Sequence, residues 1–406
     1  MRTLRDLPAA AIVGSIADAA ERWTDADYPA RVRATRAVME RTGYSEPVVD
    51  FALDRLFQDL TRAHLMQTIA GELGSIDALD GFVPRPDRSE VFFRGLDAVT
   101  IVSSDTTIGV AIAPLAFALA AKCAVVVKDR DDSLVAAFGE TLAEERPDFS
   151  ASLAVERWKA HDDPHALARF AQSDIVVAFG NDRALRAIRE TLPPQARFMT
   201  FGHRTSAGYV SREALANEAS ARALAAAAAR DALLYDGEGC LSVHALFVES
   251  GASVSPEAFA RLLSAALAEA AREFPSSREA GPAALAYERR ARFAAAQGDG
   301  TVYGMPEGHL VTIDPHGGPP PLLPRTLALY PIAEPAEALA VLRRHDLPLE
   351  AFALPGDARA DLVTLAVRSG AARIAPPGTL QAPTIRSEHG GVPRILPFVR
   401  AIVRER

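Results

Sequence analysis

The stretch DAVTIVSSDTTIGVAIAPLAFALAAKCAVVVK, residues 97–128, contains the pattern that decides the fold. Its two ends, residues 97–104 and 124–128, are apolar and β-branched, which is typical of strands buried on both faces. The part between them is apolar enough to resemble a membrane span, but Pro114 and Lys122 interrupt it. The stretch therefore predicts a strand, a buried helix over 110–121 and a second, parallel strand.

The same alternation continues along the chain. Residues 174–180 and 196–202 are apolar strand-like segments, and helical patterns cover 132–146 and 182–191. Strands that alternate with helices indicate a parallel sheet covered on both faces, the architecture of nucleotide-binding domains. Ligands of such sheets bind at the carboxyl ends of the strands.

The segments on either side of this region have different patterns. The first ninety residues have helical spacing, in segments 15–23, 28–43 and 46–73. After residue 210 an alanine-rich helix is predicted to reach about residue 233 and to end at a left-handed Asp236-Gly237 cap. A buried strand (242–248) and a further strand and helix then predict a second α/β domain from about residue 238; the last two span 325–333 and 335–346.

Composition limits the function. The chain has 406 residues, 49% apolar and 24% charged, with a net charge of −8, so it is globular, long enough for several domains, and poorly suited to nucleic acid. Two cysteines cannot form a disulfide framework, and the start of the chain lacks the pattern of an export signal, so we expect a cytoplasmic protein. The spacing of His, Cys, Asp and Glu predicts no metal site.

Cys240 is the first candidate for chemistry. It lies in YDGEGCLSVHALFVES (235–250), between a helix and a strand, where Gly237 and Gly239 allow positive φ and the close approach of a ligand. A nucleophile on a sharp turn and a small buried residue both fit this position. Cys123 lies within an apolar run and is predicted to belong to the core.

Four segments together resemble the aldehyde dehydrogenase superfamily: CAVVVKD (123–129), VVAFGND (176–182), FMTFGHRTSAGYV (198–210) and GEGCLSVHALFVE (237–249). The pairing of FGHR with GEGC, and the tail QAPTIRSEHGGVPRILPFVR (381–400), resemble the acyl-CoA reductases that include the long-chain fatty-acid reductase of luminous bacteria. This resemblance implies an aldehyde dehydrogenase-like α/β fold with a Rossmann-type cofactor domain and a second α/β catalytic domain. The implied ranges are a helical N-terminal region packing on the cofactor domain (1–90), the cofactor domain (91–237), the cysteine domain (238–375) and a segment returning to the cofactor domain (376–406).

The resemblance also implies a reaction. Cys240 would attack an acyl-CoA or acyl-carrier thioester, and a reduced nicotinamide, NADPH with NADH as the alternative, would convert the acyl-enzyme to an aldehyde. His203 could donate a proton or support the thiolate, but it could equally bind carrier phosphates or pack. Water-using relatives have a catalytic glutamate where this chain has FGHRTS (201–206), with no carboxylate, and this favours a reductase.

Cofactor contacts are implied at two strand ends. Lys128 matches the family lysine that contacts the adenosine ribose, Asp131 matches an acid that selects an unphosphorylated ribose, and Arg130 could meet a 2′-phosphate. At the other strand end Gly180 precedes Asn181 or Asp182, either of which can cap the next helix and leave backbone N–H groups for a phosphate.

Asp105 departs from the family pattern, because relatives place an asparagine there to donate to the oxyanion. A carboxylate cannot donate, so Asp105 is protonated, Thr106 or Thr107 donates instead, or catalysis is impaired. The alternatives are therefore an acyl-phosphate reductase, an impaired nucleotide- or acyl-binding partner of an acyl-protein synthetase, and a cysteine acyltransferase or thioesterase. The resemblance further implies a homo-oligomer, either a dimer or a tetramer.

Overall fold

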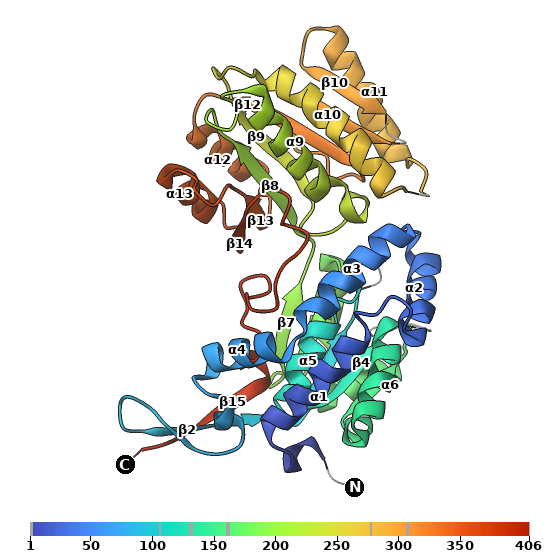
Figure 1. The fold of residues 1–406 in the computed structure, drawn as a ribbon, viewed down its shortest axis with the longest axis vertical. Helices are drawn as coiled ribbons and strands as arrows, with labels where there is room; N and C mark the ends of the chain where they lie inside the picture. The colour runs from blue at the N-terminus through green and yellow to red at the C-terminus, as the bar shows by residue number, and fades with distance from the viewer. Residues whose placement is uncertain are drawn as a thin grey trace. The chain divides into compact units, whose positions relative to one another are not determined.

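The computed structural model describes residues 3–104, 107–129, 133–159, 163–276, 278–305 and 308–405. Over this part the chain divides into two compact units (Figure 1). Unit 1 comprises Met1–Thr42, Val49–His203 and Thr384–Arg406, and unit 2 comprises Gly43–Val48 and Arg204–Pro383.

Unit 1 contains a parallel sheet in the strand order β5-β4-β3-β6-β7. Its strands are β3 (Ala98–Val102), β4 (Ala124–Lys128), β5 (Leu153–Glu156), β6 (Ile175–Phe179) and β7 (Arg197–Phe201). The chain builds outward from β3 to β4 and β5, then returns to the other side of β3 with β6 and β7. This is the order of a Rossmann-type sheet, in which the ligand crevice opens where the direction reverses, here between β3 and β6.

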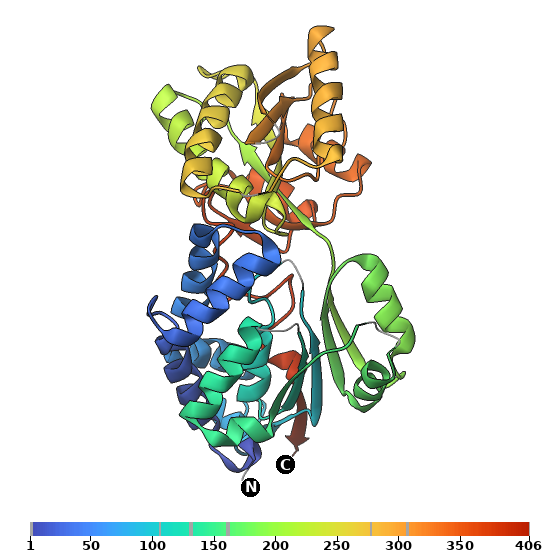
Figure 2. The same ribbon diagram turned by 90° about the vertical axis from the view of Figure 1, so that its right-hand side faces the viewer.

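Helices cover both faces of this sheet. On one face α7 and α8 bury Phe170, Leu185 and Ile188 against Val102, Val176 and other strand residues. Figure 2 shows these two helices in green on one side of the sheet and α6 in blue-green on the other. The helices are α1 (Ala9–Arg22), α2 (Pro29–Thr42), α3 (Glu46–Asp59), α4 (Arg62–Leu73), α5 (Ile112–Ala120), α6 (Leu134–Glu145), α7 (Pro164–Gln172) and α8 (Asp182–Thr191).

The helix predicted over 46–73 is two helices. α3 ends at Asp59 and α4 begins at Arg62, because Thr61 adopts an extended conformation and its hydroxyl accepts a hydrogen bond from the N–H of His64. A threonine in this role marks a helix start. The periodicity continues across the break, so it indicates helix without showing where one helix ends.

The end of the chain adds a small antiparallel sheet to unit 1. Its order is β1-β2-β15, with β1 (Val83–Pro84), β2 (Glu90–Gly95) and β15 (Val399–Arg404). β15 pairs along β2 from Val399 opposite Gly95 to Arg404 opposite Glu90. Residues from the two ends of the sequence therefore share one unit.

Unit 2 is built on a second, mainly parallel sheet, in the order β10-β11-β12-β9-β8-β13-β14, with β10 antiparallel to β11. The strands are β8 (Thr205–Val210), β9 (Val243–Glu249), β10 (Thr301–Met305), β11 (His309–Ile313), β12 (Thr326–Ile332), β13 (Leu349–Ala353) and β14 (Arg373–Ala375). The helices are α9 (Glu218–Leu233), α10 (Pro256–Glu273), α11 (Pro282–Ala296), α12 (Pro335–Arg344) and α13 (Ala360–Arg368).

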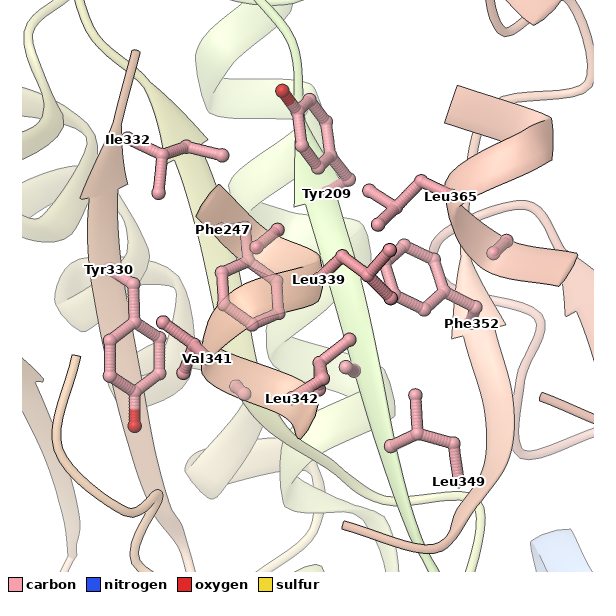
Figure 3. Packing of buried hydrophobic residues seen from close by; sticks show 14 of the residues in the cluster. Tyr209, Phe247, Tyr330, Ile332, Leu339, Val341, Leu342, Leu349, Phe352 and Leu365 are labelled. Carbon is pink, nitrogen blue, oxygen red and sulfur yellow. The ribbon is translucent and has the colours of Figure 1, made fainter. Parts of the chain in front are cut away.

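The core of unit 2 lies between this sheet and α12 and α13. Figure 3 shows Phe247 and Tyr330 on neighbouring strands, facing Leu339 of α12, while Leu365 of α13 packs nearby. The rings of Phe247 and Tyr330 are stacked with their centroids 5.4 Å apart. These continuous buried strands fit the prediction of a second α/β layer system.

The division predicted near residue 238 falls inside unit 2. β8 and α9, which precede that position, belong to unit 2, and the boundary in the structure lies between His203 and Arg204. The predicted helix after residue 210 is also shorter, since α9 begins at Glu218 after the Asn217 cap.

The apolar stretch 108–127 contains the short helix α5 followed by β4, as predicted. None of the helices described in the structure has the length and apolarity needed to cross a bilayer.

Candidate active site

Cys240 lies on a tight turn just before β9. The carbonyl of Gly239 accepts a hydrogen bond from the N–H of Ser242 at 2.9 Å, which closes the turn around Cys240 and Leu241. Cys240 is partly exposed, whereas Cys123 is fully buried and directs its thiol toward the carbonyl of Phe398. The cysteine in the GEGC segment is therefore the one placed on a turn.

An unusual backbone segment leads into this turn. Tyr235, Asp236 and Gly237 all have positive φ, at 56°, 54° and 74°. A Cβ added to Gly237 would lie 3.0 Å from the carbonyl oxygen of Ala232 and 3.0 Å from the nitrogen of Arg325, so a side chain does not fit there. Gly239 does not have positive φ, and so Gly237 alone fulfils that part of the prediction within this segment.

Buried polar contacts fix the segment in place. The Asp236 carboxylate pairs with the guanidinium of Arg325 at 2.7 Å, and both side chains are buried. Beyond the turn, the Gln381 amide donates to the Ser242 hydroxyl at 3.0 Å. The Ser206 hydroxyl donates to the carbonyl of Cys240 at 2.9 Å. The backbone that carries the thiol is therefore held on both sides.

Residues of three neighbouring strands meet Cys240 at the amino edge of the unit 2 sheet. The local strand order is β9-β8-β13, and all of these strands are parallel. Cys240 precedes β9, Arg204 precedes β8, and Glu350 is the second residue of β13. The Arg204 Nε lies 3.7 Å from the Glu350 carboxylate. We call Arg204, Ser206, Cys240 and Glu350 the Cys240 cluster.

The surroundings of the thiol favour its protonated form. Burial raises the pKa of the Cys240 thiol to about 12, and the negative charge of Glu350 acts in the same direction. The backbone N–H groups of Cys240 and Leu241 and the positive charge of Arg204 act in the opposite direction, because they stabilise the thiolate. Formation of the nucleophile at neutral pH therefore requires removal of a proton.

Three members of this cluster were not among the predicted catalytic residues. Arg204 and Ser206 lie within FGHRTS, which was examined only for the lack of a carboxylate. Glu350 is a single charged residue in the apolar stretch LPLEAFALPG (347–356), and only 7% of it is exposed. A buried charge inside a predicted strand was the available signal.

His203 is not part of the cluster. It lies in the loop between β7 and β8, is exposed, and ends unit 1, whereas Cys240 belongs to unit 2. Its catalytic role stays a prediction. His244 is buried on β9 with its Nδ1 3.4 Å from the carbonyl of Thr326, and burial lowers its pKa, as suits a core histidine.

The predicted cofactor residues lie at the carboxyl edge of the unit 1 sheet. Lys128 is the last residue of β4 and is half-buried. Gly180 follows β6, and the side chain of Asn181 accepts a hydrogen bond from the N–H of Ala184 at 2.9 Å. Asn181 is thus the helix cap, and Asp182 is the first residue of α8. These positions flank the point where the strand order reverses.

Three predicted site residues, Asp105, Arg130 and Asp131, lie outside the described residues. The oxyanion donor and the choice between a free and a phosphorylated ribose therefore stay predictions.

An aromatic stack beside this edge was not predicted. The rings of Phe179 and Phe201, at the ends of β6 and β7, are 4.8 Å apart, and the His389 ring lies 4.2 Å from Phe201. His389 belongs to SEHGG, in which Gly390 and Gly391 have positive φ and form a two-residue turn closed by hydrogen bonds between His389 and Val392. The tail thus reaches the strand ends of unit 1.

A hollow in unit 1 lies at the opposite edge of this sheet. It has a volume of about 290 Å³ and is lined by residues at the amino ends of the strands, among them Ala98, Ala124 and Ser152. Ligands of Rossmann-type sheets bind at the carboxyl ends, so this hollow is not the predicted cofactor site.

Comparison with known proteins agrees with this arrangement. The family model described as acyl-CoA reductase (LuxC) matches residues 4–401. A long-chain acyl-protein thioester reductase of Photorhabdus laumondii is 22% identical over 241 residues, which cover 58% of this chain and 49% of that protein. A protein of the same description from Aliivibrio fischeri is 23% identical over 244 residues, with the same coverage of 58% and 49%. The aligned part of the chain spans about half the length of these curated relatives.

Solved structures show the same fold at low identity. An NAD-dependent benzaldehyde dehydrogenase from Corynebacterium glutamicum is 16% identical, with a TM-score of 0.71 over 99% of this chain and 87% of that one. An oxidoreductase from Marinobacter aquaeolei is 15% identical, with a TM-score of 0.72 over 98% and 86%. The predicted aldehyde dehydrogenase-like fold is thereby confirmed.

Proposed function

Because the chain belongs to the acyl-CoA reductase (LuxC) family, we propose that it reduces an acyl thioester to an aldehyde through an acyl-enzyme on Cys240. The curated relatives are described as long-chain acyl-protein thioester reductases, and this supports a long-chain acyl group as substrate. Coenzyme A and an acyl-carrier protein are both suitable donors, because the reacting group is the same thioester.

The observation that carries this proposal is the position of Cys240 on its turn. The thiol is partly exposed, and the N–H groups of Cys240 and Leu241 stabilise negative charge beside it. Such groups can also stabilise the oxyanion that forms when a thiol attacks a carbonyl. FGHRTS (201–206) supplies no carboxylate to activate water, so the acyl-enzyme should survive until it is reduced.

The reductant in this proposal is a nicotinamide dinucleotide, and the unit 1 sheet fits it. The strand order reverses between β3 and β6, which is where dinucleotides bind in Rossmann-type sheets. The Lys128 ammonium would hold the ribose hydroxyls, and the backbone N–H groups after Asn181 would face a phosphate. When bound, the dinucleotide supplies the hydride, and family habit favours NADPH.

The first test is intact-protein mass spectrometry after incubation with a long-chain acyl-CoA in the absence of any dinucleotide. We expect an increase equal to the mass of one acyl group, mapped to Cys240. Cys240→Ser should lose the adduct and reduce NADPH consumption by at least about 1,000-fold, because no nucleophile remains. Cys123→Ser is the matched control and should retain both.

Other outcomes identify the alternatives. Adduct formation and NADPH oxidation with an acyl phosphate, but not with acyl-CoA, would indicate an acyl-phosphate reductase. Steady release of coenzyme A without dinucleotide, at a rate that NADPH does not change, would indicate a thioesterase or acyltransferase. A wild-type protein that forms no adduct with either donor contradicts the proposal.

A further inference from the structure

Glu350 occupies an irregular position in β13. Leu349 pairs with Thr205 of β8 and Ala351 pairs with the next residue, Ser206, so Glu350 is an additional residue on its strand, forming a β-bulge. Bulges redirect side chains and are frequent next to active sites. The Glu350 carboxylate extends toward Arg204 at the amino edge of the sheet, which is the edge that carries Cys240.

The Ser206 hydroxyl connects the bulge directly to the Cys240 turn. It accepts a hydrogen bond from the N–H of Ala351 at 3.2 Å and donates to the carbonyl of Cys240 at 2.9 Å. Ser206 is fully buried, so this bridge is not replaced by solvent. The backbone next to Glu350 and the backbone of Cys240 are therefore held within reach of one hydroxyl group.

Two arginines accompany the buried carboxylate. The Arg204 guanidinium is 3.7 Å from it, and Arg373 on β14 interacts with its charge. A carboxylate that is 93% removed from solvent is costly to the fold unless such charges compensate it. The sequence thus places an acid inside an apolar strand, next to the nucleophile, at a cost that packing alone does not explain.

We propose that Glu350 is the base that removes the thiol proton of Cys240, a role that rests on the proposed acyl-enzyme function. The proton moves from sulfur to the carboxylate, directly or through one water molecule, as the sulfur electron pair forms the bond to the thioester carbonyl carbon. The bond from that carbon to the donor sulfur then breaks, and Glu350 returns the proton to the departing thiolate. No other reactant is consumed in this exchange.

The need for a base follows from the Cys240 thiol itself. Since burial holds its pKa near 12, little thiolate exists at neutral pH. The carboxylate that other members of the fold carry in the segment equivalent to 201–206 is missing here. Glu350 provides a carboxylate from a different strand, on the same edge of the sheet as the sulfur.

The competing explanation is that Glu350 only repels the thiolate. The two explanations predict opposite effects for Glu350→Gln, which removes the charge and the base but keeps the size. If Glu350 only repels, the variant has more thiolate and is acylated faster than wild type. If Glu350 is the base, acylation at pH 7 becomes about 100-fold slower or more, although the thiol pKa falls.

The experiment measures single-turnover acylation by rapid quenching and intact mass, from pH 6 to pH 10, with excess acyl-CoA and no dinucleotide. In parallel, the thiolate absorbance near 240 nm, corrected with Cys240→Ser, gives the thiol pKa of each variant. We expect the Glu350→Gln rate to rise about tenfold per pH unit, because it depends on preformed thiolate, and so to approach the wild-type rate at high pH. Glu350→Asp should restore part of the lost rate.

The matched control is Asp346→Asn, an exposed acid four positions earlier whose positive φ of 45° suits asparagine. It removes the same charge outside the cluster and should leave the acylation rate within about twofold of wild type. A Glu350→Gln protein that is folded and acylated as fast as wild type, or faster, overturns the role of Glu350 but leaves the proposed function intact. A wild type without an adduct overturns both.

Discussion

At the scale of single residues, the conformation of the backbone before Cys240 is as important as the sulfur. The three consecutive residues with positive φ, Tyr235, Asp236 and Gly237, bring the chain from α9 to the turn. Each conformation of this kind costs a residue other than glycine about 1–2 kcal/mol. The buried Asp236–Arg325 ion pair offsets this cost, because it ties the segment to the start of β12.

The glycines of GEG offer a matched pair of substitutions. Gly237→Ala should lower the free energy of unfolding by about 2–4 kcal/mol, because its φ is positive and the new Cβ would contact backbone atoms at 3.0 Å. Gly239→Ala should cost less than about 1 kcal/mol, because the nearest atom to its Cβ would be the Ser242 hydroxyl at 3.4 Å. Denaturant unfolding of both variants measures the difference, and equal losses would contradict the role given to Gly237.

Sequence reasoning at this scale found Cys240 and missed its neighbours. GEGC is a local signal, since two glycines beside a cysteine within four residues indicate a turn. Glu350 and Ser206 approach Cys240 only because β13 and β9 lie on either side of β8, and the sequence does not reveal strand order. The bulge that directs Glu350 is likewise a property of the pairing between strands.

At the scale of elements, the strands with continuous apolar runs were predictable and those with small or polar residues were not. The predicted strands at 124–128 and 174–180 correspond to Ala124–Lys128 and Ile175–Phe179. β8, with the sequence TSAGYV, contains Ser, Gly and Thr and does not show a strand pattern, yet all its residues are buried. Burial between β9 and β13, rather than intrinsic preference, makes this segment a strand.

The His389 turn gives unit 1 a predicted sensitivity to acid. Burial, with a contribution from the charge of Arg394, lowers the pKa of His389 to about 3, while an unfolded histidine titrates near 6.5. Below pH 6.5 the unfolded chain therefore binds a proton that the folded chain does not bind. Stability is fully present above pH 6.5 and is lost as the pH falls toward 3.

His389→Phe should remove this dependence, because phenylalanine keeps a ring against Phe201 without a titratable group. Between pH 7 and pH 5 we expect wild type to lose about 1–2 kcal/mol more unfolding free energy than the variant. Urea unfolding at both pH values measures this difference. His316→Phe, at an exposed position, is the control and should follow wild type; identical pH dependence in all three proteins would contradict the assignment.

At the scale of the whole molecule, the units are not consecutive pieces of sequence. Unit 1 takes its last segment from Thr384 onward, and β15 completes a sheet with β2. The boundary near residue 238 was predicted because Asp236-Gly237 resembles an interdomain turn, but Gly237 lies within unit 2. The boundary in the structure has no such signal, since only the three residues Gly202, His203 and Arg204 separate β7 from β8.

The proposed cofactor residues and the Cys240 cluster belong to different units, so their functions should be separable by substitution. Lys128→Ala should weaken NADPH binding by about tenfold through loss of a charge-assisted hydrogen bond to the ribose, and leave acylation of Cys240 unchanged. Cys240→Ser should bind NADPH normally and form no acyl adduct. Titration of NADPH fluorescence measures binding, NADH in parallel measures dinucleotide preference, and the exposed Lys159→Ala is the matched control. Wild-type NADPH affinity in Lys128→Ala would remove Lys128 from the cofactor site, and loss of the acyl adduct in that variant would show that the two functions are coupled.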